Sequence, residues 1–381
     1  MSRFALTLTI SAVLATALLV PNAGAATTQD PSRPCLGDLT AAGVPMEPGR
    51  PLRMGISPAG LAGTLGPTDP VTPIDRRRTL AALRRLRPAQ APFVLRLTRF
   101  SWADGNRGIA RMLHETRQYT RRGYRVELQL RYKPRASQEG DIRAWVRFVR
   151  KVVRQFAPDP LVTGIQVTNE VNFYPIAPDA SDSAYQGARD ALIRGVEAAH
   201  HLAGRIGARH LRIGFNWVYR TDPATESAFW TYLRDHGGPR FARSVDWVGL
   251  DAYPGTVFPP LEPSIGTGYR DGMVNAMSEL RHCFMPIAGL DRRVPIHVEE
   301  NGWPTGPGRP EDEQVMALRQ IVGAVEDFRG TYHVTDYRWF DLRDHDTASL
   351  NFQHHYGLLR DDYSRKPAFS AYRRLVRQIS G

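Results

Sequence analysis

Eight short apolar runs alternate with helical patterns along this chain, and the alternation limits the possible folds more than any other feature of its 381 residues. Most of the runs are rich in valine, isoleucine, leucine or aromatic residues, as buried parallel strands are. We expect strands at residues 52–57, 93–98, 125–131, 162–167, 211–216, 247–251, 295–299 and 335–339. Their order predicts successive βα units.

Helical patterns fill the intervals between these runs. Asp75 can cap a helix that runs to Leu86, and Asp141 can cap a helix over 142–156. Further helices are expected over 183–206, 311–328 and 367–379. Eight βα units in one uninterrupted series favour a closed (β/α)₈ barrel, the TIM barrel, in a single domain. An open dinucleotide-binding sheet is not supported, because no glycine-rich phosphate-binding motif follows the first run.

The first 25 residues have the pattern of a signal peptide. Arg3 gives a positive start, an apolar stretch of 16 residues follows, and Ala23-Gly24-Ala25 supplies a small-residue cleavage site. The stretch is short for a membrane span, although an uncleaved anchor is the alternative. Residues 26–50 are expected to form an irregular lead-in and 51–381 the barrel domain. We therefore expect a secreted, extracellular monomer with no membrane attachment after cleavage.

The formal net charge of +12 does not by itself indicate a nucleic-acid partner. Only three of the basic residues are lysines, and the arginines are spread along the chain. The clusters at 76–78 and 84–85 are expected on the solvated face of a helix. The two cysteines, Cys35 and Cys283, are expected to form one disulfide, with two separate thiols as the alternative. Neither lies in a zinc-ligand pattern, so no metal is expected.

Carboxylates stand where two of the expected strands end. In a barrel the active site forms at the carboxyl ends of the strands. The fourth strand is followed by Asn169-Glu170, and the seventh ends at Glu299-Glu300. Strand alternation predicts that Glu300 faces one side and that His297 and Glu299 face the other. Glu170 and Glu300, 130 residues apart in sequence, can then meet across the barrel mouth.

Such a pair suits the cleavage of a glycosidic bond. One carboxyl group donates a proton to the leaving oxygen while the other attacks the anomeric carbon. The reaction requires neither a metal nor an organic cofactor, and we expect none.

The motifs around these carboxylates resemble those of the clan A retaining glycoside hydrolases, over roughly residues 51–378. Asn169-Glu170 after strand four and a glutamate ending strand seven are the main points of similarity. The segment at 300–304, Glu-Asn-Gly-Trp-Pro, resembles the nucleophile segment of β-1,3-glucanases. The Tyr-Pro pair after strand six is similar to galactanases, and the C-terminal part is similar to cellulases. The family within the clan stays open.

This resemblance implies roles for individual residues. Glu170 would be the general acid and then the general base, and Glu300 the nucleophile, in preference to Glu299. Four further residues would contact substrate or nucleophile, and Arg99 competes with Arg96 for its role. In the resembling enzymes an asparagine binds the sugar 2-hydroxyl and an arginine keeps the nucleophile ionised; Asn169 and Arg96 match these two. A tyrosine contacts the nucleophile, and an aromatic side chain lies beneath the sugar in the subsite at the cleaved bond; Tyr253 and Trp339 match these two. Trp217 and Trp303 are additional candidates for the cleft.

The sequence therefore predicts a secreted retaining β-glycosidase that acts on a polysaccharide or oligosaccharide. A carbohydrate-binding barrel without catalysis and a transglycosylase with the same residues remain alternatives. A metal-dependent hydrolase on this fold is disfavoured, because we find no His/Asp ligand set at several strand ends.

Overall fold

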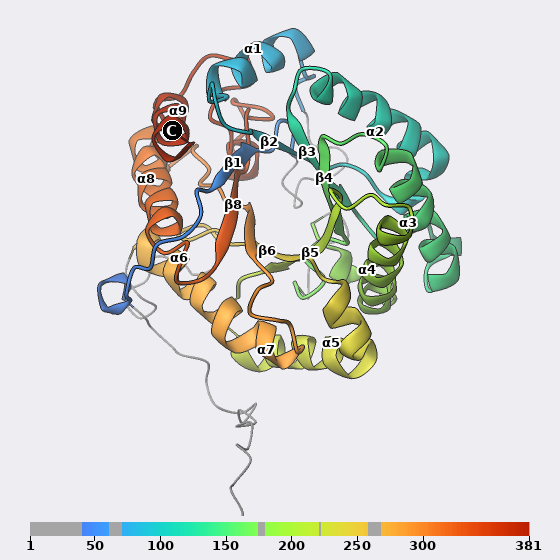
Figure 1. Ribbon diagram of the computed structural model, residues 1–381. Coiled ribbons are helices and arrows are strands. Elements are labelled where there is room, and N and C mark those ends of the chain that lie inside the picture. The colour runs from blue at the N-terminus through green and yellow to red at the C-terminus, as the bar shows by residue number, and fades with distance from the viewer. Residues whose placement is uncertain (1–39, 61–70, 174–179, 221, 258–267, 381) are drawn as a thin grey trace, which may run out of the picture. The chain divides into compact units, whose positions relative to one another are not determined.

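The computed structural model describes residues 40–60, 71–173, 180–220, 222–257 and 268–380. Eight parallel strands pair in sequence order and close into a barrel, with β1 next to β8 (Figure 1). The predicted (β/α)₈ barrel and its order of strands are confirmed. The strands are β1 (Arg53–Ile56), β2 (Val94–Leu97), β3 (Arg125–Leu130), β4 (Val162–Val167), β5 (Arg212–Val218), β6 (Trp247–Asp251), β7 (Ile296–Glu300) and β8 (Val334–Trp339).

Helices surround this barrel (Figure 1). They are α1 (Arg76–Leu86), α2 (Gly105–Thr120), α3 (Ile142–Phe156), α4 (Ala188–Arg205), α5 (Pro223–Ser244), α6 (Tyr269–Ser278), α7 (Met285–Ile287), α8 (Glu311–Asp327) and α9 (Pro367–Ser380). A π-helical segment, Glu279–Phe284, joins α6 to α7.

Two helices begin where their capping residues predict. The side chain of Asp75 accepts a hydrogen bond of 3.0 Å from the backbone N–H of Arg78, and Asp141 accepts one of 2.8 Å from Ala144. Each carboxylate satisfies a backbone donor that a helix start leaves unpaired. The helix expected from residue 183 instead begins at Ala188, because a short 3₁₀ turn, Asp182–Ala184, precedes it.

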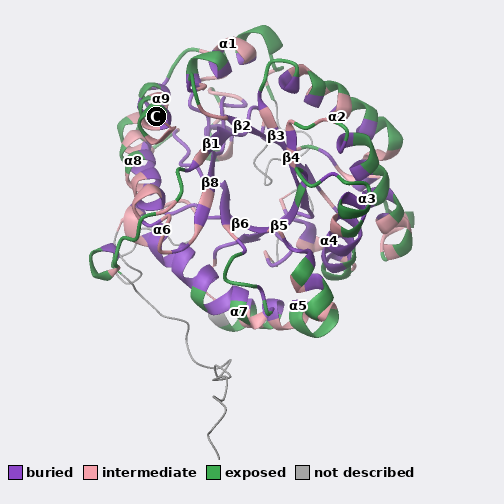
Figure 2. Cartoon of the chain, in the orientation of Figure 1, coloured by how far each residue is buried: buried purple, intermediate pink, exposed green. Residues whose placement is uncertain are grey.

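The strands and the inner faces of the helices are buried, whereas the outer faces of the helices are exposed (Figure 2). In α3, Trp145, Val149, Val152 and Phe156 are all buried completely. Their spacing places them on one face of the helix, which packs toward the barrel. The outward faces of the strands supply the other half of this apolar layer.

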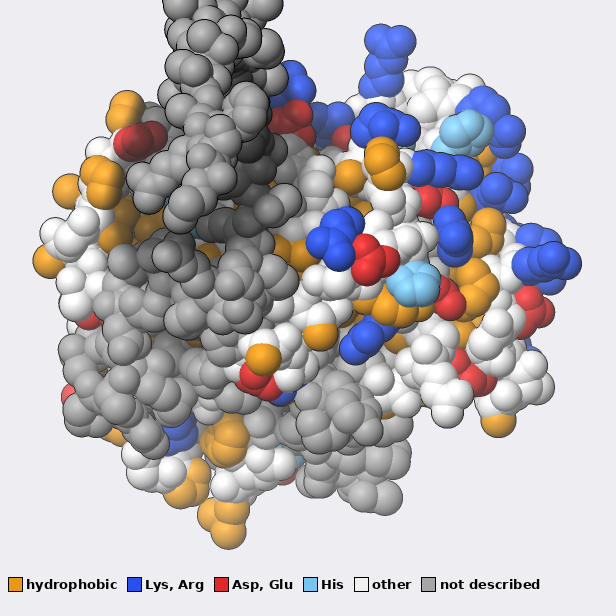
Figure 3. Space-filling view, turned by 90° about the horizontal axis from the view of Figure 1, so that it is seen from below, with side chains coloured by type: hydrophobic (Ala, Val, Ile, Leu, Met, Phe, Trp, Pro, Cys, Tyr) orange, Lys and Arg blue, Asp and Glu red, His pale blue; other side chains and the backbone are white. Residues whose placement is uncertain are grey.

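Arginines account for much of the exposed charge. Many Lys and Arg side chains project from the face drawn in Figure 3. The clusters at 76–78 and 84–85 lie exposed on α1, as expected.

The structure describes only part of the N-terminal region. The signal peptide and Cys35 lie outside the described residues, so the cleavage site and the disulfide with Cys283 stay predictions. Within the lead-in, residues 40–50 contain one 3₁₀ turn, Ala41–Gly43, and are otherwise irregular. Among the described residues, no helix is long and apolar enough to cross a membrane.

Candidate active site

Glu170 lies in a tight turn directly after β4. Thr168 and Glu170 have φ angles of 66° and 47°, a conformation that residues other than glycine rarely adopt. Hydrogen bonds hold the turn: the backbone N–H of Glu170 donates to Oδ1 of Asn216 (2.9 Å), and Oγ of Ser181 donates to the carbonyl of Glu170 (2.6 Å). Glu170 is only 7% exposed. The backbone strain is thus compensated by neighbouring side chains at the mouth of the barrel.

Glu300 ends β7 at an irregularity of the sheet. Leu250 pairs with Val298, but the next residue of β6, Asp251, pairs with Glu300. Glu299 is therefore an extra residue, and the strand bends there as at a β-bulge. Both Glu299 and Glu300 reach the barrel interior, where both contact Arg96. The expectation that they face opposite sides was wrong, because the bulge interrupts the alternation of side chains along the strand.

Arg96 of β2 is the cation beside Glu300. Its side chain is completely buried, and its Nη1 donates to Oε1 of Glu300 at 2.6 Å. Its Nη2 donates to Oε1 of Gln166 at 2.7 Å. Arg99 is exposed after the end of the strand, so the geometry assigns this contact to Arg96.

Tyr253, which follows β6, interacts with the other carboxylate oxygen of Glu300. Its hydroxyl donates to Oε2 of Glu300 at 2.8 Å, and the ring is 8% exposed. Glu300 thus accepts hydrogen bonds from Arg96 and Tyr253 on separate oxygens, and Oε1 also accepts one of 3.4 Å from Nε2 of Gln129. Donors at both oxygens hold the carboxylate in one orientation.

Three carboxyl groups meet at this point of the barrel. One oxygen each of Glu170, Asp251 and Glu300 lies within 4.8 Å of the other two. Burial, followed by the charge of Glu300, raises the pKa of Glu170 to about 8. The same two causes raise the pKa of Asp251 well above its ordinary value. The site therefore contains one carboxylate with charged partners and two carboxyl groups that tend to keep their protons.

Asn169 lies between these groups. Its Oδ1 accepts hydrogen bonds from Nε2 of Gln129 (2.6 Å) and Nδ2 of Asn216 (3.0 Å). With its oxygen engaged, its Nδ2 faces the carbonyl of Ala180 at 3.1 Å and Oε2 of Glu170 at 3.5 Å. The amide is therefore oriented with its donor group beside Glu170.

Trp339 does not join the site. It is completely buried and packs against Tyr372 of α9, with 6.4 Å between ring centroids. The inward positions of β8 belong to Asp336 and Arg338, so alternation turns Trp339 outward. The next residue, Phe340, contacts Tyr253 instead, at 6.4 Å between centroids. An aromatic residue does lie beside the site, but one position later than expected.

The two other tryptophan candidates are also in the core. Trp217 is completely buried, and its Nε1 donates to Oε2 of Glu226 at 2.5 Å. Trp303 is 3% exposed, and the guanidinium of Arg309 lies 4.1 Å from its ring centroid. Neither ring offers a free face to a sugar in this structure.

Sequence reasoning missed Asp251, Asn216 and Gln129. Each is a polar residue within or at the end of a strand, on the face that alternation turns toward the barrel interior. That signal was present in the sequence. A buried polar side chain requires a partner: Asn216 donates to Asp251 and accepts from the backbone of Glu170, and Gln129 donates to Asn169 and Glu300.

Two clusters have the side-chain composition of metal sites, namely Glu170–Asp251–Glu300 and Glu127–His297–Glu299. In both, the carboxylates already have arginine partners: Arg96 contacts Glu299 and Glu300. The expectation of a metal-free site remains a prediction.

Comparison with known proteins concerns the fold. The sequence matches no protein-family model and no curated protein. The solved structures that it resembles include a family 39 glycoside hydrolase from Bacteroides cellulosilyticus WH2, with a TM-score of 0.55, 14% identity and coverage of 87% of this chain and 64% of that one. This chain therefore spans less than two thirds of the length of that enzyme.

Two other solved structures have similar TM-scores. A GH5_18 protein from Bifidobacterium longum subsp. infantis has a TM-score of 0.58 and 14% identity, over 86% of this chain and 79% of that one. A family 1 β-glucosidase from Thermotoga maritima has a TM-score of 0.59 and 13% identity, over 79% and 85%. Identities this low establish a shared fold only. A closed (β/α)₈ barrel is thus the fold that this chain shares with these glycoside hydrolases, and the family stays open.

Proposed function

We propose that this protein is a retaining β-glycosidase, with Glu300 as nucleophile and Glu170 as general acid and base. One observation carries the proposal: Glu300, which accepts hydrogen bonds from Arg96 and Tyr253, lies beside a second glutamate whose pKa is raised. Two neighbouring carboxyl groups with different environments are what separate a nucleophile from a proton donor.

In the first step Oε of Glu300 attacks the anomeric carbon while Glu170 gives its proton to the departing glycosidic oxygen. The covalent bond that forms removes the charge of Glu300. That charge is the second cause of the raised pKa of Glu170, after burial, so the pKa of Glu170 then falls. Glu170 can then take a proton from water, whose oxygen displaces Glu300 and completes hydrolysis with net retention.

The spacing of the carboxyl groups supports retention. Their nearest oxygens lie within 4.8 Å, close to the roughly 5–5.5 Å typical of retaining pairs. Inverting enzymes need a water molecule between attacker and sugar and separate their carboxyl groups by about 6.5–9.5 Å.

The proposed substrate is a neutral β-linked polysaccharide or oligosaccharide. The neighbours include a β-glucosidase and an exo-β-1,4-mannosidase, which makes β-glucosides and β-mannosides the first substrates to test. We also propose secretion, with Cys35 and Cys283 bonded. Thiol titration of the unfolded, unreduced secreted protein then detects no free thiol, and two free thiols would refute the bond.

The test begins with a panel of aryl β-glycosides, laminarin, galactan, mannan, xylan and cellulose. On the first substrate cleaved, ¹H NMR follows the anomer formed before mutarotation. We expect the β-anomer to form first. The turnover rate per enzyme molecule is expected to stay constant while substrate is in excess. The α-anomer would refute retention, and binding without turnover across the panel would favour the carbohydrate-binding alternative.

A further inference from the structure

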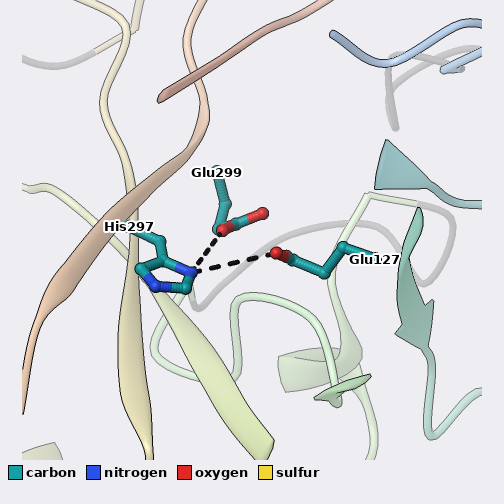
Figure 4. A group of neighbouring side chains, drawn as sticks. All are labelled: Glu127, His297 and Glu299. Carbon is teal, nitrogen blue, oxygen red and sulfur yellow. Dashed lines mark ion pairs between the residues drawn. The ribbon is translucent and has the colours of Figure 1, made fainter. Parts of the chain in front are cut away.

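A chain of buried ion pairs runs through the barrel interior beneath the candidate nucleophile. Figure 4 shows its centre, where Nδ1 of His297 lies 3.2 Å from Glu299 and 3.8 Å from Glu127. On its other side, Nε2 of His297 lies 3.1 Å from Asp336. Glu299 in turn lies 3.2 Å from Nε of Arg96. Ionisable side chains in mutual contact thus connect β8, β7 and β2.

His297 lies between carboxylates on both sides of its ring. Carboxylate oxygens lie near both ring nitrogens, and this arrangement favours the positively charged imidazolium form. Burial by itself lowers the pKa of His297, but Asp336, Glu127 and Glu299 raise it to about 9. The indole of Trp247 stacks on the imidazole with 4.6 Å between centroids and 7° between planes, which fixes the plane of the ring.

Further charged side chains surround Glu299 and its partners. Arg338 of β8 lies 3.4 Å from Glu127 and 2.7 Å from Asp336, and Arg53 of β1 lies 2.6 Å from Asp336. Burial, followed by the charge of Glu127, raises the pKa of Glu299 to about 8, although His297 and Arg338 act in the opposite direction. These residues with Arg96 form the ionic layer: Arg53, Arg96, Glu127, His297, Glu299, Asp336 and Arg338.

Glycines on the neighbouring strands make room for these long side chains. A Cβ on Gly249 of β6 would lie 3.0 Å from Cγ of Glu299, and one on Gly164 of β4 would lie 2.9 Å from Cγ of Glu127. A Cβ on Gly55 of β1 would lie 2.8 Å from Cδ of Arg338. Three strands therefore lack a side chain where the layer needs space.

Arg96 is the member of the layer that reaches the nucleophile. Its Nε faces Glu299 at 3.2 Å, its Nη1 donates to Glu300 at 2.6 Å, and its Nη2 donates to Gln166 at 2.7 Å. Two nitrogens of the planar guanidinium thus donate hydrogen bonds, and the third, Nε, lies in an ion pair with Glu299, so a different group lies beside each nitrogen.

We propose that Glu299, held by His297, is a positioning residue that fixes the guanidinium of Arg96 against Glu300. This inference rests on the proposed function for its catalytic consequence only. Glu299 touches neither the sugar nor the proton in transit. Its contribution is the placement of Arg96, whose Nη1 must stay aligned with Glu300 while the nucleophile loses its charge in the transition state.

The first test compares Glu299→Ala and Glu299→Gln with the parent in steady-state kinetics. Glutamine keeps the shape and an oxygen beside Nε of Arg96 but removes the ionisable group, whereas alanine removes all three. We expect kcat to fall roughly 10- to 100-fold in Glu299→Ala, since small misplacements at a reacting centre cost that much. Glu299→Gln is expected to lose only about 10-fold, and KM is expected to stay within about threefold in both.

Glu197→Gln is the matched control. Glu197 is also a buried glutamate with two arginine partners, Arg194 at 3.2 Å and Arg240 at 3.5 Å, but it lies on α4. We expect parent kcat and KM. If Glu299→Gln keeps the parent kcat, or if the loss in a folded variant arises entirely in KM, the proposal is overturned. Glu299→Gln keeps the test available if Glu299→Ala does not fold.

A spectroscopic readout separates this inference from the proposed function. The Nε–H of Arg96 gives a ¹⁵N NMR signal that Arg96→Lys identifies by its loss. We expect Glu299→Ala to shift this signal and Glu197→Gln to leave it in place. An unmoved signal in Glu299→Ala would overturn the positioning role even in an active enzyme. A shifted signal in a protein without glycosidase activity would uphold the placement of Arg96 and refute the proposed function alone.

Discussion

The two faces of the same eight strands differ in almost every respect. Toward the helices they present apolar side chains such as Ile165, Phe215 and Val248, all completely buried. Toward the barrel axis they present Arg96, Glu127, Gln166 and Asn216, together with several glycines, and these polar side chains are also almost completely buried. Both faces exclude water, but only one of them does so with charged and hydrogen-bonding groups.

The two faces therefore contribute differently to the molecule. Burial of an apolar side chain stabilises by an amount that depends mainly on its area and packing, so many substitutions of similar volume are tolerated. A buried polar side chain is tolerated only with its partners in place, and each inner residue has a particular partner. We expect outer substitutions to change stability and inner substitutions to change activity.

The largest expected effects concern the two glutamates at the end of the inner face. Glu300→Gly is expected to reduce turnover by roughly 10³-fold or more, because the nucleophile is lost. Azide can then enter from the vacated side and give the α-glycosyl azide. Glu170→Ala is expected to form the glycosyl-enzyme from an activated aryl glycoside and stall there. Azide needs no base, so it restores turnover and gives the β-glycosyl azide.

These opposite products provide the check. Product analysis by ¹H NMR distinguishes the two azides in a single assay. The same azide from both variants would show that the roles of Glu170 and Glu300 are not the ones proposed.

A pH profile tests the charge of Glu300 through its effect on Glu170. Burial and the charge of Glu300 raise the pKa of Glu170 to about 8. The proton donor is present below that pH and lost above it, so kcat/KM is expected to fall as pH rises through about 8. A basic limb that stays in Glu170→Ala with an activated substrate would belong to another group.

Gly249→Ala and Ile165→Ala compare the two faces directly. A Cβ on Gly249 would lie 2.8 Å from Cβ of Asn216 and 3.0 Å from Cγ of Glu299, so one methyl group disturbs partners of Glu170 and of Arg96. We expect kcat/KM to fall roughly 10-fold or more. Ile165→Ala leaves an outer cavity that is expected to cost about 2–5 kcal/mol of unfolding free energy, with near-parent kcat/KM in the folded enzyme.

Thermal unfolding and kinetics on both variants decide the comparison. If Ile165→Ala loses activity as steeply as Gly249→Ala at a temperature where both are folded, the two faces do not divide stability and activity as argued.

Removal of metal ions is expected to have the smallest effect. Arg96 already contacts two of the clustered carboxylates, and the proposed steps need no Lewis acid. Dialysis against EDTA is expected to leave the hydrolysis rate unchanged. A loss that zinc or manganese alone restores would exclude the two-glutamate mechanism.

The outer face explains why so much of the fold could be predicted. Runs such as Val162–Val167, separated by amphipathic helices with capping residues such as Asp141, specify βα units locally. Eight such units can close into few arrangements of strands and helices. The carboxyl ends of the strands then show where the site must be. Glu170 and Glu300 came from that reasoning, whereas Arg96 and Tyr253 came from the resemblance, and the structure places the four side chains together.

The inner face explains what could not be predicted. The bulge at Glu299 depends on the pairing of β7 with β6, which no local pattern in β7 reveals, and it turns a side chain expected elsewhere toward Arg96. Trp339 was assigned to the site by resemblance, but its position on β8 faces α9. The ionic layer was missed because an isolated Glu or His within a strand does not reveal its partners on other strands.

Mapping of the covalent intermediate tests the central claim most directly. A 2-deoxy-2-fluoro glycoside of the sugar that the enzyme cleaves, with an activated leaving group, forms the glycosyl-enzyme but slows its hydrolysis. Peptide mass spectrometry with fragmentation then locates the sugar. We expect one sugar per molecule on Glu300, the residue that Arg96 and Tyr253 hold. A sugar on Glu299 or Glu170, or inactivation with no covalent label, would contradict the account.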